Sequence, residues 1–303
     1  MLLSAGGFAV YRAESNAINL LEPRFGNLSL KRNKEHLMDA WLASKLFERS
    51  GLDAATIRAR VIVECRNGGD FLRILMEEIA RNQHVDRWAE CTPEHLLHLP
   101  RIKETIPEAL IVHIIRDGRD VALSSAKVGY VRRGWWDRTP NVLACGLYWE
   151  WIVRRGRADG SKMGSDYMEV RFEDLILNPG TVLAKVSAFI EQDLDYDRIQ
   201  AVGIGSVSEP NTSFREDAEG EFNPIGRWKK GFSPELLATF EGLVGKLLQE
   251  VGYKLGTTDG TKLNRAELRR MRAIYRAYFD SKLWLKAKTP LGQLFVTKDL
   301  SWL

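Results

Sequence analysis

The run Ala109-Leu-Ile-Val-His-Ile-Ile115 is the part of the chain that most limits its fold. It is an almost unbroken series of apolar and β-branched residues, and Arg116-Asp-Gly-Arg119 follows it directly, with a helical period after that. A strand that is apolar on both faces is typical of a parallel sheet, because helices cover both faces of such a sheet. The run therefore predicts an α/β protein in which this strand leads straight into a helix.

The same alternation of short β-rich runs and long helical periods continues along the chain. Strands are predicted at residues 60–65, 87–90, 109–115 and 167–171. Helices with 3.6-residue apolar periods are predicted at residues 71–80, 93–105, 119–128, 142–157, 181–190 and 234–251. Strands that alternate with helices favour a parallel sheet flanked by helices.

Charge, cysteine content and hydropathy exclude several classes of protein. The net charge is +4, from 44 Lys and Arg against 40 Asp and Glu, which is too mild to indicate nucleic-acid binding and suits a weakly anionic ligand better. Cys65, Cys91 and Cys145 are an odd number of cysteines without metal-ligand spacing, so neither a disulfide framework nor a zinc site is indicated. No segment approaches the roughly 18 apolar residues of a membrane span, and a cytoplasmic location is expected.

The charge is uneven along the chain, and the change falls near Gly256. From there to Leu303, ten basic and four acidic residues give +6, which leaves −2 for the body. We therefore predict a main domain at 1–255 and a basic helical extension at 256–303. One face of the expected helix carries Leu268, Met271, Tyr275, Tyr278 and Phe279. Two interpretations remain open: a helix docked on the body with a solvated basic face, or a helix that contacts an anionic polymer or a membrane surface.

The junction that follows residue 115 has the chemistry of an anion site. Ligands of parallel sheets bind beyond the carboxyl ends of the strands, where helix N-terminal N–H groups and the helix dipole attract phosphate. Arg116 adds a forked donor there and Ser124 a hydroxyl about two turns into the helix, so the two could hold one phosphate. The alternative is that Arg116 and Arg119 pair with Asp117 and Asp120 as ordinary capping charges.

Four segments match the motifs of one family. They are residues 111–124, Trp88-Ala-Glu-Cys-Thr-Pro-Glu-His95, Val170-Arg-Phe-Glu-Asp-Leu-Ile-Leu-Asn-Pro179 and Ile225-Gly-Arg-Trp-Lys-Lys230. The first resembles the 3′-phosphate motif of the sulfotransferases that use PAPS (3′-phosphoadenosine 5′-phosphosulfate). The others resemble the family's Trp-x-x-Lys-Thr-Pro, Val-x-Tyr-Glu-Asp-Leu-x-x-x-Pro and Gly-Arg-Trp-Lys segments. The resemblance covers most of residues 1–255 and implies a P-loop-NTPase-like parallel sheet of the sulfotransferase type, flanked by helices.

The resemblance also implies roles for single residues. Those it assigns to the nucleotide are Arg116, Ser124, Phe172, Ser213, Arg227 and Lys229. Arg116 and Ser124 would hold the 3′-phosphate of PAPS. Phe172 stands where the family often has a tyrosine, so a packing surface would remain and a hydroxyl contact would be lost. Ser213 is a looser match, and a plain turn hydroxyl is its alternative. PAPS would be the co-substrate, and no metal would be required.

The base is the second role that the resemblance suggests. Sulfuryl transfer to a hydroxyl needs a group that takes the acceptor proton. Residues 3–15 line up with the segment that carries a glutamate base in tyrosylprotein-type members, which makes Glu14 the candidate base, with a solvated loop carboxylate as the alternative. Cys91 stands where many members have a lysine, so a cation near the transferring group would be missing.

One family motif is absent from the sequence. The Pro-x-Ser-Gly-Thr-Thr P-loop, which cradles the 5′-phosphosulfate in the family, does not occur in it. In the aligned register, Met1-Leu-Leu-Ser-Ala5 corresponds to the second half of the helix that follows this loop. We therefore expect the first strand and the P-loop to lie upstream of Met1, in a longer sulfotransferase of which this chain is a shortened form. Such a chain is expected to bind PAPS weakly.

Two functions follow from these features. The first is an enzyme that transfers the sulfuryl group of PAPS to an acceptor hydroxyl or amine. The second is a catalytically inactive member that serves as a binding or scaffold protein. A metal-dependent P-loop kinase is disfavoured, because no Walker lysine is present. The acceptor stays open between carbohydrate, peptide, lipid and small molecule. The aromatic residues at 135, 136, 148, 149 and 151 could stack on such an acceptor or pack in the core.

Overall fold

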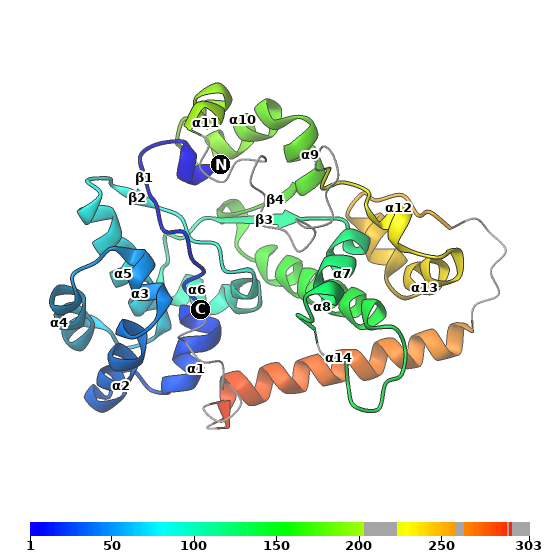
Figure 1. Ribbon diagram of the computed structural model, residues 1–303, viewed down its shortest axis with the longest axis horizontal. Coiled ribbons are helices and arrows are strands. Elements are labelled where there is room, and N and C mark those ends of the chain that lie inside the picture. Colours follow the sequence, from blue (N-terminus) through cyan, green and yellow to red (C-terminus); the bar gives the residue numbers. More distant parts are fainter. Residues whose placement is uncertain (132, 203–222, 258–263, 290, 293–303) are drawn as a thin grey trace. The chain divides into compact units, whose positions relative to one another are not determined.

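The computed structural model describes residues 1–131, 133–202, 223–257, 264–289 and 291–292 (Figure 1). The chain divides into two compact units. Unit 1 comprises Met1–Leu110, Gln192–Ile204 and Lys282–Leu303, and unit 2 comprises Ile111–Glu191 and Gly205–Ser281. Among the described residues, no helix combines the length and the hydropathy required to cross a bilayer.

Unit 1 consists mainly of helices around one pair of short strands. Its strands are β1 (Phe8–Ala9) and β2 (Arg87–Trp88). Its α-helices are α1 (Glu22–Phe25), α2 (Lys31–Leu42), α3 (Lys45–Ser50), α4 (Ala54–Glu64), α5 (Gly68–Asn82), α6 (Leu99–Thr105) and α11 (Tyr196–Val202). Tighter or wider turns form η1 (Leu2–Ser4), the π-helix η2 (Ala17–Leu21) and η3 (Pro93–His98). The strands pair in parallel, with Phe8 opposite Arg87, and α5 contacts both of them.

The strand predicted at residues 60–65 is wrong, because residues 60–64 belong to the end of α4 and Cys65 follows the helix as its C-cap. Asp53 caps this helix by accepting a hydrogen bond from the Thr56 backbone N–H at 2.7 Å. Ile57 and Val61, four residues apart, are fully buried, whereas Val63 is 78% exposed. The burial therefore follows the helical period of the longer segment, and the short β-branched run around Val61 is only part of it.

Unit 2 contains the strand and helix that the sequence singles out. Its strands are β3 (Ile111–Ile115) and β4 (Tyr167–Arg171). Its helices are α7 (Gly118–Lys127), α8 (Asn141–Gly160), η4 (Gly164–Asp166), α9 (Phe172–Leu177), α10 (Pro179–Ile190), α12 (Trp228–Gly231), α13 (Pro234–Glu250) and α14 (Arg265–Lys288), whose last residues from Lys282 are counted in unit 1. The strands pair in parallel from Ile111 opposite Tyr167 to Ile115 opposite Arg171, as expected for a parallel sheet.

The described residues thus form two parallel two-stranded sheets, one in each unit, in a mostly helical protein. Three of the four predicted strands are confirmed, with β2 and β3 two residues shorter than expected. All six predicted helices are present, although the segment 93–105 is split into η3 and α6 where Pro100 starts the second helix. A single P-loop-like sheet remains a prediction.

The core of unit 2 lies between α7, α8, α13 and α14 (Figure 1). Phe240, Leu243 and Val244 of α13 pack there with the buried residues of α8. Helix α14 contributes the buried Tyr275 and Phe279, and Leu268, Met271 and Tyr278 pack against the same cluster. The apolar face predicted for the tail is therefore docked on unit 2, and the loop that joins α7 to α8 lies next to this helix through contacts described below.

Candidate functional site

The candidate site in unit 2 is built on the junction where β3 ends and α7 begins. Asp117 caps α7, because its Oδ1 accepts a hydrogen bond from the Arg119 backbone N–H at 3.0 Å. Trp149 of α8 donates its indole N–H to the Arg116 carbonyl at 3.2 Å. A Cβ at Gly118 would lie 2.5 Å from the Trp149 ring, so only glycine allows this approach. The junction is thus fixed from the α8 side.

A buried carboxylate fixes the same junction from the β4 side. Glu173, at the start of α9, accepts a hydrogen bond from the Asp117 backbone N–H at 3.0 Å. Its other oxygen accepts a hydrogen bond from the Tyr253 hydroxyl, whose oxygen also lies 3.2 Å from the Ile115 carbonyl oxygen. Glu173 belongs to the segment that resembles Val-x-Tyr-Glu-Asp-Leu, and in this protein it holds the strand-to-helix turn in place. Sequence reasoning did not assign it a role.

Arg119 is a structural arginine. Its guanidinium makes two hydrogen bonds to the Asp117 carboxylate, at 2.9 and 2.7 Å, and one to Glu241 at 2.7 Å, all in a buried setting. Its Cζ lies 3.8 Å from the ring centre of Trp228. Burial disfavours the charge, but Asp117 and Glu241 outweigh it, so the pKa of Arg119 is raised. The capping interpretation is therefore correct for this residue, which is committed to the core.

Arg116 is placed differently, because it forms no ion pair in the described part of the chain, although its charge acts on Asp120. Its Nη2 donates to the Pro224 carbonyl at 2.6 Å, and its Cζ lies 4.9 Å from the ring centre of Phe172. Its Nε is buried and has no hydrogen-bond partner among the described residues. A half-buried guanidinium with an unused donor is well suited to an anionic ligand. The structure thus brings Arg116 and Phe172 together.

The loop that ends at Arg227, directly before the helix α12 that carries Lys229, is tied to the first turn of α7. Asp120 accepts hydrogen bonds from the backbone N–H groups of Gly226 and Trp228, each at 2.8 Å. Burial raises the pKa of Asp120, and these two N–H donors oppose the rise. Ser124 lies four residues after Asp120, and therefore on the same face of α7 as this loop. Asp120 is an anchor that the sequence does not reveal, since local spacing suggests for it only the alternative role of a capping charge.

Glu14 belongs to unit 1, in a turn that a second buried carboxylate holds. Glu90 accepts hydrogen bonds from the backbone N–H of Ser15 at 3.0 Å and from its hydroxyl at 2.8 Å. It also accepts one from Thr92, and it lies 2.9 Å from Nδ1 of His95. Burial raises the pKa of Glu90, but these partners outweigh burial, so the net shift is downward. The Glu14 side chain itself is exposed, next to this ordered turn.

The Glu14 turn lies close to the segment that resembles Trp-x-x-Lys-Thr-Pro. Partial burial raises the pKa of the Cys91 thiol, and the negative charges of Glu90 and Glu14 raise it further. The electrostatic effect of Glu14 on Cys91 shows that the candidate base and the position that replaces the family lysine are neighbours. Cys91 is therefore held as a neutral thiol, and it supplies no positive charge near Glu14.

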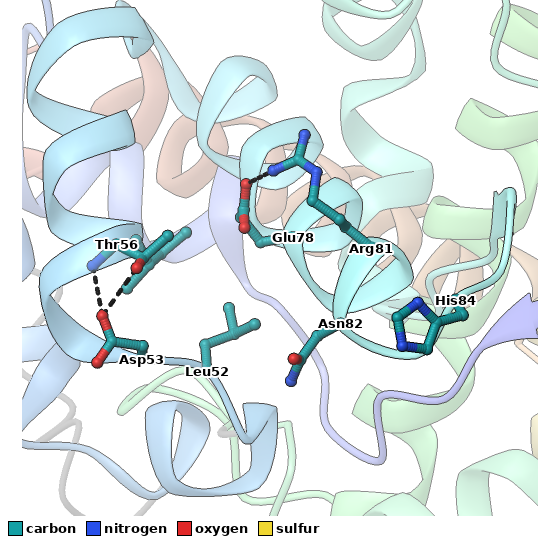
Figure 2. Close-up of a pocket in the computed structure, with 8 residues that line it drawn as sticks. Leu52, Asp53, Thr56, Glu78, Arg81, Asn82 and His84 are labelled. Carbon is teal, nitrogen blue, oxygen red and sulfur yellow. Dashed lines mark hydrogen bonds and ion pairs between the residues drawn. The ribbon is translucent and has the colours of Figure 1, made fainter.

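A separate cavity in unit 1, of about 240 Å³, lies where α4 and α5 meet (Figure 2). Its charged residues are already satisfied by one another. Asp53 caps α4 through Thr56, and Glu78 pairs with Arg81 and with Arg60. Figure 2 shows the Asp53–Thr56 and Glu78–Arg81 pairs on the cavity wall. The cavity therefore has the character of a gap between helices whose polar groups already serve the fold.

Several other predictions can be placed. Ser213 lies outside the described residues. Trp149 is buried at the junction and Trp151 donates to Asp280 at 2.9 Å, so both serve packing. Trp135 is 88% exposed, which leaves it available for a ligand.

The three cysteines are all free, and the described residues contain no group of three or more His, Cys, Asp or Glu side chains arranged to hold a metal.

Comparisons with known proteins agree with this architecture. Residues 11–196 match the model of the Sulfotransferase family. Among solved structures, the chain is similar to a sulfotransferase domain from the curacin biosynthetic pathway, with a TM-score of 0.52 and 14% sequence identity over 84% of this chain and 92% of that chain. The comparison with curated proteins finds no match. The family match covers more than half of the sequence, and the chain therefore belongs to the sulfotransferase family.

Proposed function

We propose that the protein binds PAPS and transfers its sulfuryl group to an acceptor hydroxyl or amine. The observation that carries this proposal is the setting of Arg116. It lies at the carboxyl end of a parallel strand, stacks on Phe172, and has a buried Nε without a partner among the described residues. An orphaned buried donor at the positive end of a helix fits a phosphate group.

The other residues of this unit 2 site would complete the hold on the nucleotide. Ser124 would offer a hydroxyl from the same helix face as Asp120, and Arg227 and Lys229 would add positive charge from the loop that Asp120 anchors. Arg119 is already paired with Asp117 and Glu241. Of the two arginines at the junction, we therefore assign the phosphate contact to Arg116. Ser213 is proposed as a further contact on resemblance only.

The proposed base is Glu14. In the transfer, the acceptor oxygen forms a bond to sulfur, the bond from sulfur to the bridging phosphate oxygen breaks, and the acceptor proton passes to the Glu14 carboxylate. The exposed position of Glu14 lets an acceptor reach it, and the Glu90 hydrogen bonds to Ser15 fix the backbone next to it. No metal is needed for this step, since the proton goes to a carboxylate and the charge to the leaving nucleotide.

Sulfur-labelled PAPS tests the proposal directly. The full chain is incubated with labelled PAPS and a panel of phenolic, sugar and amine acceptors, and labelled product is counted. We expect acceptor-dependent transfer. Glu14→Gln should lower turnover by roughly a hundredfold or more, because general-base catalysis contributes about that much, while the Kd for PAP, the desulfonated nucleotide, stays unchanged.

Glu35→Gln is the matched control, because Glu35 is another carboxylate of unit 1, in α2, whose side chain is 45% exposed and pairs with Lys31. It should behave like the wild type. Turnover that survives in Glu14→Gln would refute the assignment of the base. Binding of PAP without transfer to any acceptor would favour the alternative, a catalytically inactive binding or scaffold protein.

A further inference from the structure

Residues of the loop between α7 and α8 line a wide, open hollow of about 710 Å³ on the surface of unit 2. Trp135, Arg133, Arg138 and Asn141 line it. Helix α7 separates the hollow from Arg116, and its ten residues span about 15 Å. The hollow is therefore distinct from the phosphate site at the other end of the same helix.

Helix α14 contacts the part of this loop that carries Trp136 and Asp137. The Tyr275 hydroxyl donates to the Asp137 carboxylate at 2.5 Å, and the Thr139 backbone N–H donates to the same carboxylate at 2.8 Å. Trp136 packs edge-on against Tyr278 of α14, with 5.2 Å between ring centres. A loop braced by a buried tyrosine and an aromatic contact is pre-organised, which lowers the entropy cost of binding a ligand. The Asp137 carboxylate is therefore already hydrogen-bonded to Tyr275 and Thr139.

Three groups around the hollow are left without the partners that their chemistry favours. Trp135 is 88% exposed, and its only ring contact among the described residues is a T-shaped one with Trp136, so most of its surface is open to a ligand. Arg138 is exposed and forms no ion pair in the described part of the chain. The Oδ1 atom of Asn141 is buried and accepts no hydrogen bond from any described residue. The Arg133 guanidinium, also exposed, is partly used by the Thr139 carbonyl.

These groups define the chemistry of a ligand. An open indole face stacks on the C–H face of a sugar ring, an unpaired guanidinium binds a carboxylate or a sulfate, and an unsatisfied amide oxygen accepts a hydrogen bond from a hydroxyl. An acidic carbohydrate carries all three features. An aromatic molecule without hydroxyl groups would leave Asn141 unsatisfied, and a neutral sugar would leave Arg138 unpaired.

We propose that this hollow binds an acidic carbohydrate, and that it anchors the part of a sulfuryl acceptor remote from the reacting hydroxyl. The second clause rests on the proposed function, whereas the first concerns binding alone. Because the anchor lies about one helix length from Arg116, it acts on acceptor affinity and leaves nucleotide binding unchanged. The same arrangement explains why α14 packs where it does, since it braces the loop as well as the core.

Two tetrasaccharides test the proposal by calorimetry on the full chain. Hyaluronan tetrasaccharide carries glucuronate carboxylates, and tetraacetylchitotetraose is a neutral counterpart of equal length. We expect the acidic probe to bind at least ten times more tightly. Trp135→Ala should weaken both probes tenfold or more, because stacking does not depend on charge. Arg138→Gln should weaken the acidic probe alone and remove the preference.

Trp284→Ala and Arg265→Gln serve as controls, because both side chains are exposed on α14, outside the loop. They should bind both probes as the wild type does. Equal affinity for the two probes, or unchanged affinity in Trp135→Ala and Arg138→Gln, would overturn the proposal. Titration of PAP into the same variants separates the two claims. Saccharide binding without PAP binding would reject the proposed function and support the carbohydrate site. PAP binding without saccharide binding would reject the carbohydrate site and leave the proposed function standing.

Discussion

At the scale of single residues, the structure separates two arginines that the sequence presents as equivalent. Arg116 and Arg119 lie three positions apart, beside Asp117 and Asp120. Arg119 turns inward to Asp117 and to Glu241, which lies 122 residues away in the sequence. Arg116 meets Phe172 and a backbone carbonyl instead. Local spacing predicts that this junction binds an anion, but only the long-range partner Glu241 decides which arginine is available.

Histidine 113 gives a prediction about stability. It is buried in β3, with Nδ1 2.6 Å from the Tyr167 hydroxyl, and burial lowers its pKa to about 4 from the ordinary 6.5. Between these values the unfolded chain binds a proton that the folded chain does not, so acidification favours unfolding. As the pH falls from 6.5 to 4, protonation of His113 in the unfolded chain should lower the free energy of unfolding by about 3 kcal/mol.

Urea unfolding of the wild type and of His113→Gln at several pH values checks this prediction. Carboxylates contribute their own acid dependence in both proteins, so the difference between the two curves isolates the histidine. The wild type should lose more stability than the variant as the pH falls from 6.5. Parallel curves would show that folding leaves the pKa of His113 at its ordinary value of 6.5.

At the scale of elements, the strand-to-helix junction is predicted well, whereas the end of α4 is predicted as a strand. The apolar run before Arg116 has no competing pattern, so β3 and α7 follow from it directly. The run around Val61 is shorter and fits a strand or a buried helix face equally. The signal that favours a helix is the capping pair Asp53 and Thr56, which comes before the β-branched residues in the sequence. The two sheets show a further limit, since strand pairing depends on residues distant in the sequence.

The packing of Trp149 on the junction gives a second stability prediction. Gly118→Ala would place a methyl group 2.5 Å from the Trp149 ring, in a region fixed by Glu173 and Asp117. Such overpacking costs about 2 kcal/mol of unfolding free energy. Gly180→Ala is the control, because nothing lies within 4 Å of its Cβ position in α10. Equal denaturant midpoints for the two variants would show that Trp149 does not pack this closely.

At the scale of the whole molecule, the candidate functions are divided between the two units. Unit 1 holds the Glu14 turn with Glu90, Thr92 and His95, and unit 2 holds the Arg116 site and the hollow. The resemblance pointed to Glu14 and Arg116 because both lie in recognisable segments. The hollow could not be predicted in this way, because its loop follows no motif and its shape depends on Tyr275 and Tyr278 from α14.

The central claim is that Arg116 binds the 3′-phosphate of the nucleotide. Adenosine 3′,5′-bisphosphate and its 2′,5′ isomer carry the same charge and differ only in the position of one phosphate, so their Kd values on the full chain test it most directly. Arg116→Gln removes the guanidinium, and Lys162→Gln removes an exposed charge of unit 2 as a control.

We expect the wild type and Lys162→Gln to prefer the 3′,5′ isomer at least tenfold. In Arg116→Gln, affinity for that isomer should fall by about 2 kcal/mol, roughly thirtyfold in Kd, because one charged hydrogen bond is lost. The 2′,5′ isomer should be unaffected. Equal binding of the two isomers by the wild type, or a preference that survives in Arg116→Gln, would contradict the claim.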